Sequence, residues 1–320
     1  MAHYLVTGGA GFIGSHLVER LLREGHRVRV LDDFSTGFEA NLEAVRRAGE
    51  DRLEVVRGDV VDPDTVAESV RGTDGVFHEA AIGSVPRSVE QPLPTHAANC
   101  TGTLNVLVAM RDLGIRRLVF ASSSSVYGAL EELPKREDHP TRPISPYGLS
   151  KLASEEYLRI FNELYGMEAV SLRYYNVFGP RQNPSGPYAA VIPLFMSRLL
   201  RRERPVIDGD GEQSRDFTYV TNVVDANLAV MEAQAEVVRA GLFNVAAGGR
   251  YSLNHLLDVL RGLLGTDPGV EHGPPRPGDI KHSQADISRI RDTLGYVPRV
   301  SFEEGIRRTL EYFKELENAA

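Results

Sequence analysis

A tyrosine and a lysine four residues apart could perform acid–base chemistry. Tyr147 and Lys151 lie in one short segment, and in a helix residues i and i+4 share a face. Ser145 suits a helix cap and Pro146 suits a first turn, so we expect a helix to begin here. A phenol has a pKa of about 10, and a nearby ammonium lowers it by stabilising the phenolate. Read with Ser123 upstream, the pair predicts a base usable near neutral pH, although alone it could equally be a surface helix contact.

Strand-like and helix-like segments alternate through the first half of the chain. Short runs rich in β-branched or aromatic residues lie at 4–7, 27–31, 53–56, 75–78, 117–121 and 169–172. Between them lie helix-length segments such as 12–24, which has apolar residues four apart and Gly25 as a stop. This alternation predicts an α/β fold with a doubly wound parallel sheet and helices on both faces.

A glycine-rich loop follows the first expected strand. Gly8, Gly11 and Gly14 form G-x-x-G-x-x-G, which permits a tight turn and close approach of the backbone to a pyrophosphate. Free N–H groups at the helix N-terminus would hold that anion. Asp32, after the second expected strand, would accept hydrogen bonds from the ribose diol of NAD and repel the phosphate of NADP. These features predict a Rossmann-like site for NAD, although Asp32 and Asp33 could instead form a solvated turn.

The pattern changes after about residue 178, where a segment rich in Gly and Pro precedes short mixed elements. We therefore expect two domains. The NAD-binding Rossmann domain is assigned residues 1–176 plus about 222–249, with 242–245 returning to the main sheet as a strand. A smaller C-terminal α/β domain that binds substrate is assigned 177–221 plus 250–320.

The order and spacing of further motifs resemble the extended short-chain dehydrogenase/reductase family, and within it the nucleotide-sugar 4-epimerases. The resemblance covers nearly the whole chain and rests on 7–14, 59–60, 78–81, Asn99, 122–128, 147–151, 173–179 and 214–217. The UDP-N-acetylglucosamine 4-epimerases also share 84–88, 188–193 and 282–286. The family implies a catalytic set of Ser123, Tyr147 and Lys151, with the neighbouring serines competing for the role of Ser123.

The resemblance also implies two sets of binding residues and no metal. The NAD contacts would be Gly8, Gly11, Phe12, Ile13, Gly14, Asp32, Asp33, Ser35, Thr36, Gly37, Asp59, Val60, Ala80, Ala81, Asn99, Tyr147, Lys151 and Tyr174. The substrate contacts would be Ser84, Ser123, Ser125, Tyr147, Asn176, Ala190, Val191, Arg215, Arg276, Asp279 and Ser283. Asp59 could equally cap a loop, and either arginine could be a surface charge. Val206 and Ile207 lie where some relatives place an aromatic residue that contacts the nucleotide base, so the identity of the base is left undecided.

The implied reaction is NAD-dependent 4-epimerisation of a UDP-hexose through a transient 4-keto sugar. Tyr147 would take the proton of the 4-hydroxyl, and Ser123 would hydrogen-bond to that oxygen. In relatives a bulky tyrosine at the position of Ser283 excludes a 2-acetamido group. Serine therefore favours UDP-GlcNAc/UDP-GalNAc, with UDP-glucose/UDP-galactose also accepted.

Other reactions of the same fold are the alternatives. Related dehydratases carry Asp-Glu where this chain has Ser124 and Ser125, which disfavours dehydration, and decarboxylation is disfavoured less firmly. A UDP-glucuronate 4-epimerase would need a cation near sugar carbon 6, for which Arg87 is the candidate. A redox-sensing protein that binds NAD without catalysis is an alternative of another class, but such proteins typically lack the Tyr–Lys pair.

Composition narrows the function class further. The net charge is −8 without a long basic run, which disfavours nucleic-acid binding. The one cysteine, Cys100, rules out an internal disulfide and a cysteine-based zinc site. Neither a leader-like start nor an apolar run of about 18 residues is present, so we expect a cytoplasmic protein. The apolar arcs of segments 101–113 and 147–161 fit the four-helix bundle through which relatives form homodimers.

Overall fold

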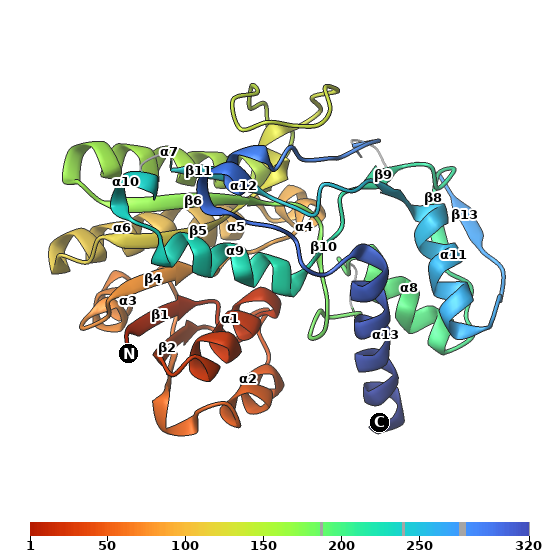
Figure 1. The fold of residues 1–320 in the computed structure, drawn as a ribbon, viewed down its shortest axis with the longest axis horizontal. Coiled ribbons are helices and arrows are strands. Elements are labelled where there is room, and N and C mark those ends of the chain that lie inside the picture. The colour runs from red at the N-terminus through yellow and green to blue at the C-terminus, as the bar shows by residue number, and fades with distance from the viewer. Residues whose placement is uncertain (186–187, 239–240, 275–279, 320) are drawn as a thin grey trace.

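The computed structural model describes residues 1–185, 188–238, 241–274 and 280–319. Its centre is a seven-stranded parallel sheet in the order β11-β6-β5-β4-β1-β2-β3 (Figure 1). The strands are β1 (His3–Thr7), β2 (Arg27–Asp32), β3 (Leu53–Arg57), β4 (Gly75–His78), β5 (Arg117–Ser123), β6 (Glu168–Tyr174) and β11 (Leu242–Val245). The predicted doubly wound sheet is therefore confirmed, including the late return of β11.

Helices cover both faces of the sheet, and the central strands β4 and β5 are accordingly buried along almost their whole length. One face packs against α1 (Phe12–Arg23), α2 (Glu39–Arg46) and α9 (Val220–Glu232), and the other against α3 (Pro63–Val70), α6 (Gly102–Leu113) and α7 (Pro146–Tyr165). Leu17 and Val223 lie in the first core, and Val106 and Leu158 in the second. Shorter elements are α4 (Val85–Glu90), α5 (Pro92–His96), α10 (Ala235–Val238), a π-helical turn (Ala97–Thr101) and two 3-10 turns (Glu50–Arg52, Ser124–Tyr127).

The remaining elements form a smaller unit with its own core. It contains α8 (Val191–Leu200), α11 (Leu253–Leu264), α13 (Phe302–Ala319) and three strand pairs: β7 (Val177–Phe178) with β10 (Thr218–Tyr219), β8 (Val206–Asp208) with β13 (Glu271–Gly273), and β9 (Ser214–Arg215) with β12 (Tyr251–Ser252). Phe178, Phe195 and Phe302 are buried together there. Helix α12 (Ser288–Leu294) departs from this arrangement, because Ile290 on this helix and Tyr296 after it belong to the core on the face of the large sheet that α1 and α9 cover.

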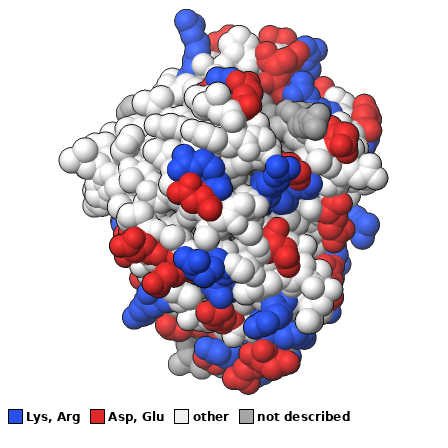
Figure 2. Space-filling model, turned by 90° about the vertical axis from the view of Figure 1, so that its left-hand side faces the viewer, with Lys and Arg blue, Asp and Glu red and all other residues white. Residues whose placement is uncertain are grey.

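The face at the amino ends of the strands carries interspersed acidic and basic side chains, with a largely uncharged area in the upper left of the view (Figure 2). In the described part of the chain, no helix is both long and apolar enough to cross a membrane.

Candidate active site

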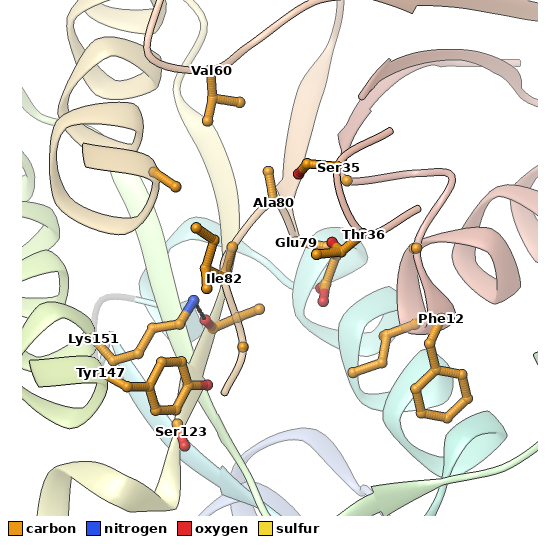
Figure 3. Close-up of a pocket in the computed structure, with 18 of the residues that line it drawn as sticks. Phe12, Ser35, Thr36, Val60, Glu79, Ala80, Ile82, Ser123, Tyr147 and Lys151 are labelled. Carbon is orange, nitrogen blue, oxygen red and sulfur yellow. Dashed lines mark hydrogen bonds between the residues drawn. The ribbon is translucent and has the colours of Figure 1, made fainter. Parts of the chain in front are cut away.

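A cavity of about 840 Å³ opens at the carboxyl ends of the strands, where parallel α/β sheets place their ligands (Figure 3). Most of the predicted site residues line it. They are Gly8, Gly11, Phe12, Ile13, Gly14, Asp32, Asp33, Ser35, Thr36, Asp59, Val60, Ala80, Ala81, Ser123, Ser125, Tyr147, Lys151, Tyr174 and Asn176. Segments far apart in sequence are thus brought to one cavity by the strands that precede them.

The glycine loop forms one wall, and its shape leaves no room for side chains. A Cβ on Gly14 would lie 2.2 Å from the carbonyl oxygen of Gly8. Gly8 has a φ of +69°, and a Cβ there would lie 2.7 Å from the backbone nitrogen of Ala80. Gly11 begins α1 without a side-chain cap, so the first-turn N–H groups remain for an anion.

Asp32, Asp33 and Asp59 line the cavity, and the carboxylate of each also accepts a backbone N–H in a turn. Asp32 is buried, and its carboxylate accepts from the backbone N–H of Ala10 and of Phe34, both at 2.8 Å. Asp32 therefore does not lie in a solvated turn. Burial raises the pKa of Asp32. Asp59 accepts from the N–H of Val61 at 2.9 Å and also lines the cavity, so the two roles considered for it are compatible.

The proposed catalytic groups converge from β5 and α7. Helix α7 begins as predicted, with the Ser145 hydroxyl accepting from the N–H of Gly148 at 3.0 Å. Lys151 lies one turn after Tyr147, and its Nζ is 6.0 Å from the centroid of the Tyr147 ring. Nζ donates to the carbonyl of Ala121 at 2.8 Å, which ties the helix to the end of β5. Tyr147, Lys151 and Ser123 all face the cavity (Figure 3).

The electrostatics of the pair differ from the prediction. Burial raises the pKa of Tyr147, a hydrogen bond with Ser123 lowers it, and the nearby Glu79 raises it. Burial lowers the pKa of Lys151 to about 8. The expected net lowering of the phenol pKa is thus wrong for the protein alone, because the effect of burial is the largest. Among the serines, the hydrogen bond to Tyr147 favours Ser123 as the partner of the phenol.

Buried polar contacts hold the serine run in place. Glu155 on α7 forms a bidentate ion pair with Arg173 on β6, at 2.9 and 2.7 Å. Its carboxylate also accepts from the hydroxyl of Ser122. Because Ser122 precedes Ser123, this network fixes the end of β5 relative to the helix that carries Tyr147.

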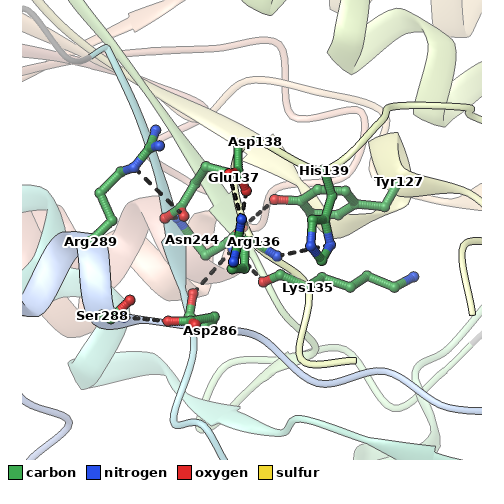
Figure 4. Close-up of polar contacts among 10 residues, drawn as sticks. All are labelled: Tyr127, Lys135, Arg136, Glu137, Asp138, His139, Asn244, Asp286, Ser288 and Arg289. Atoms are coloured by element: carbon green, nitrogen blue, oxygen red, sulfur yellow. Dashed lines mark hydrogen bonds and ion pairs between the residues drawn. The ribbon is translucent and has the colours of Figure 1, made fainter. Parts of the chain in front are cut away.

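A second network secures the segment that follows the serines (Figure 4). The Tyr127 hydroxyl donates to Oδ1 of Asn244 on β11 at 2.7 Å. The backbone N–H of Asn244 donates to Glu137 at 2.8 Å, and its side chain donates to the carbonyl of Lys135 at 2.9 Å. The segment that connects β5 to α7 is therefore bound to β11, the edge strand of the sheet.

Several predicted contacts do not line this cavity. Gly37 packs against Ala10 and Asp32, and Asn99 is buried behind the wall, accepting from the N–H of Ile82 at 2.9 Å. Ser84 caps α4, where Ser88 accepts from the N–H of Tyr147 at 3.1 Å. Ala190, Val191, Arg215 and Ser283 lie in the smaller unit, with Ser283 buried beside β9. Arg276 and Asp279 fall outside the described residues.

Comparison with known proteins identifies the family of the chain. The model of the NAD dependent epimerase/dehydratase family matches residues 4–246. The chain belongs to this family. A UDP-glucose 4-epimerase from Mycolicibacterium smegmatis is 40% identical over 312 residues, which is 97% of this chain and 98% of that protein.

Two solved structures are similar over the whole length of this family member. A UDP-N-acetylglucosamine 4-epimerase from Methanobrevibacter ruminantium, in complex with UDP-N-acetylmuramic acid, has a TM-score of 0.92 and 41% identity, covering 98% of this chain and 99% of that one. A UDP-glucose 4-epimerase from Thermus thermophilus, in complex with NAD, has a TM-score of 0.88 and 37% identity with the same coverage.

The residues of this family member fit NAD, the cofactor of its family. The space left by Gly8 and Gly14 admits a pyrophosphate against α1, and the carboxylate of Asp32 lines the cavity where a ribose diol would be recognised. The prediction of NAD as the cofactor is confirmed at the level of the family.

One residue with a strongly perturbed carboxyl group was missed from the sequence. Glu79 follows β4 directly and lines the cavity. Burial raises its pKa to about 7, while the hydrogen bond from Tyr174 and the charge of Lys151 act in the opposite direction. The available signal was its position, because a charged residue after a buried strand of a parallel sheet lies at the ligand-binding edge.

Proposed function

We propose that the protein interconverts UDP-hexoses that differ in configuration at carbon 4, with UDP-GlcNAc/UDP-GalNAc and UDP-glucose/UDP-galactose as substrates. The observation that carries the proposal is the convergence of Tyr147, Lys151 and Ser123 on a cavity shaped for a dinucleotide. A phenol beside an ammonium is suited to take a proton from a hydroxyl and to return it.

Each residue has a defined part in this proposal. Bound NAD supplies a reversible hydride acceptor for the sugar carbon. Tyr147 removes the proton of the 4-hydroxyl and later gives it back, while Ser123, hydrogen-bonded to Tyr147, stabilises the sugar oxygen. Lys151 holds a positive charge in the same cavity, which favours the phenolate. Asn176 lines the cavity at the side of the smaller unit, where the nucleotide would be anchored.

The preference for epimerisation over dehydration rests on the residues after Ser123. Ser124 and Ser125 both line the cavity, and a hydroxyl cannot replace a carboxylate as an acid or base for eliminating water. Acceptance of an acetamido group rests on the family resemblance, in which Ser283 takes the position of a bulky tyrosine that excludes this group in relatives, although Ser283 does not itself line the cavity described above. UDP-glucuronate is the second candidate, because Arg87 lines the cavity and could pair with a sugar carboxylate.

The test is to incubate the purified protein, with and without added NAD, with UDP-GalNAc, UDP-galactose, UDP-glucuronate or dTDP-glucose, and to resolve the products by chromatography. UDP-GlcNAc formed faster than UDP-glucose is the expected result. Turnover of UDP-galactose alone would refute the role of Ser283 but keep the mechanism. UDP-galacturonate would identify the second candidate, and a 4-keto-6-deoxy sugar would indicate a dehydratase. No product under either condition would support a protein that binds NAD without catalysis.

We also propose that two copies pair through the outer faces of α6 and α7. Leu149 and Leu164 on α7 are 58% and 68% exposed, so this helix presents two large apolar side chains to solvent. Light scattering after size exclusion should report a dimer, and Leu149→Asp with Leu164→Asp should give a monomer. Leu263→Asp, at an exposed leucine of α11, is the matched control. A monomeric parent protein would refute the pairing.

A further inference from the structure

Glu79 lies in the cavity but neither takes nor gives the proton that is transferred in the proposed reaction. Its Oε1 accepts from the Tyr174 hydroxyl at 2.8 Å. The Tyr174 oxygen in turn accepts from Nδ2 of Asn227 at 2.7 Å. Contacts from β6 and α9 therefore hold the carboxyl group in a fixed place. Glu79 follows β4 directly and lies among the residues that line the cavity (Figure 3).

The titratable groups that face Glu79 come from two elements. Lys151 and Tyr147 on α7 and Tyr174 on β6 all interact with its charge. The ammonium of Lys151 favours the carboxylate, whereas burial opposes it and raises the pKa of Glu79 to about 7. The charge of Glu79 is therefore finely balanced near neutral pH, and a further positive charge nearby would ionise it.

The proposed chemistry determines which end of the cofactor Glu79 faces. Tyr147 takes a proton from the hydroxyl of the carbon that is oxidised, so the nicotinamide ring must reach that same carbon and lie beside Tyr147. Glu79 lines the same cavity as Tyr147 and Lys151, and its charge raises the pKa of Tyr147, so it lies within electrostatic reach of the reacting groups. The ring is cationic in NAD and neutral in NADH, so a carboxylate there interacts favourably with the oxidised form only.

We propose that the carboxylate of Glu79 sets the redox preference of the bound cofactor, favouring NAD over NADH. The inference deepens the proposed function, on which it rests for the orientation of the cofactor. An epimerase must start each cycle with oxidised cofactor, and a site that held NADH too tightly would accumulate a form unable to oxidise a sugar hydroxyl. By favouring bound NAD, the carboxylate of Glu79 would prevent this accumulation of NADH without contacting the sugar.

The test compares dissociation constants of NAD and NADH, by calorimetry, for the parent protein and Glu79→Gln. Glutamine keeps an oxygen that can accept from Tyr174 but carries no charge. We expect the NADH-to-NAD ratio of dissociation constants to fall about tenfold in the variant, equivalent to a rise of roughly 30 mV in the potential of the bound couple. Asp59→Asn, which removes a carboxylate elsewhere in the cavity, should weaken both forms equally.

A pH series on the parent protein provides a second readout should the variant not fold. The ratio should favour NAD more strongly at about pH 7.5 than at about pH 5.5, because Glu79 ionises in this interval. Lys151, with its pKa near 8, stays mostly protonated there. An unchanged ratio in Glu79→Gln, or a pH-independent ratio in the parent protein, would overturn the proposal. Neither measurement needs a sugar substrate, so a failure of the redox proposal can be distinguished from a failure of the proposed epimerase function.

Discussion

Replacing Glu79 by glutamine should stabilise the ligand-free protein at high pH but not at low pH. The folded-state pKa of Glu79 is raised from the ordinary 4.5 to about 7, so the folded protein holds this proton more tightly than the unfolded chain. Stability is therefore lost as the pH rises from about 4.5 to about 7. At about 1.36 kcal/mol for each pH unit, the loss amounts to roughly 3 kcal/mol.

The assay is urea unfolding of ligand-free parent and Glu79→Gln proteins at about pH 5 and pH 8. The difference in unfolding free energy should be small at the lower pH and should favour the variant by up to about 3 kcal/mol at the higher one. The comparison between the two proteins at each pH is needed because a second carboxyl group also makes stability depend on pH. Burial raises the pKa of Asp216 to about 7, so its ionisation at high pH destabilises the parent protein and the variant alike. Glu315→Gln, at an exposed site, is the control. A difference that is equal at both pH values would refute a raised Glu79 pKa.

Three further outcomes test the site. Tyr147→Phe should lower kcat by about 10²- to 10⁴-fold in the epimerase assay while the calorimetric affinity for NAD changes little, because only the proton acceptor is lost. Gly14→Ala should abolish NAD binding in the same titration, since its Cβ would lie 2.2 Å from the carbonyl oxygen of Gly8; tight binding would contradict this geometry. Ser283→Tyr should lower kcat/KM for UDP-GalNAc at least about tenfold relative to UDP-galactose, and an unchanged ratio would refute the proposed gate.

The large sheet could be predicted from the sequence because its strands are short segments rich in β-branched or aromatic residues that alternate with helix-length segments. The strands of the smaller unit could not, since β7, β9, β10 and β12 are two residues long and depend on partners distant in the chain. The expected boundary also assigned all of 250–320 to the smaller unit. The contacts of Ile290 and Tyr296 with the large core arise from packing that no local pattern encodes.

The candidate site divides in the same way. Glycines, the cap of α7 and the Tyr147–Lys151 spacing are local signals, and the structure places those residues around one cavity. The pKa values of Tyr147 and Lys151 cannot be predicted from nearby residues in the sequence. They depend on desolvation and on Glu79, which is 68 positions before Tyr147 in the chain but close to it in space. Sequence spacing therefore identified the pair but gave the wrong direction for the phenol pKa.

The raised pKa of Tyr147 has a function in the proposed reaction cycle. Tyr147 would act once as a base and once as an acid in every turnover, so neither the phenolate nor the phenol can be strongly favoured. Burial and the charge of Glu79 favour the phenol, whereas Lys151 and a cationic ring favour the phenolate. Because Glu79 is the stronger acid of the two, it ionises first when positive charge enters the cavity, and its carboxylate then keeps Tyr147 able to return its proton. The same carboxylate would thus balance both the redox state of the cofactor and the protonation of the base.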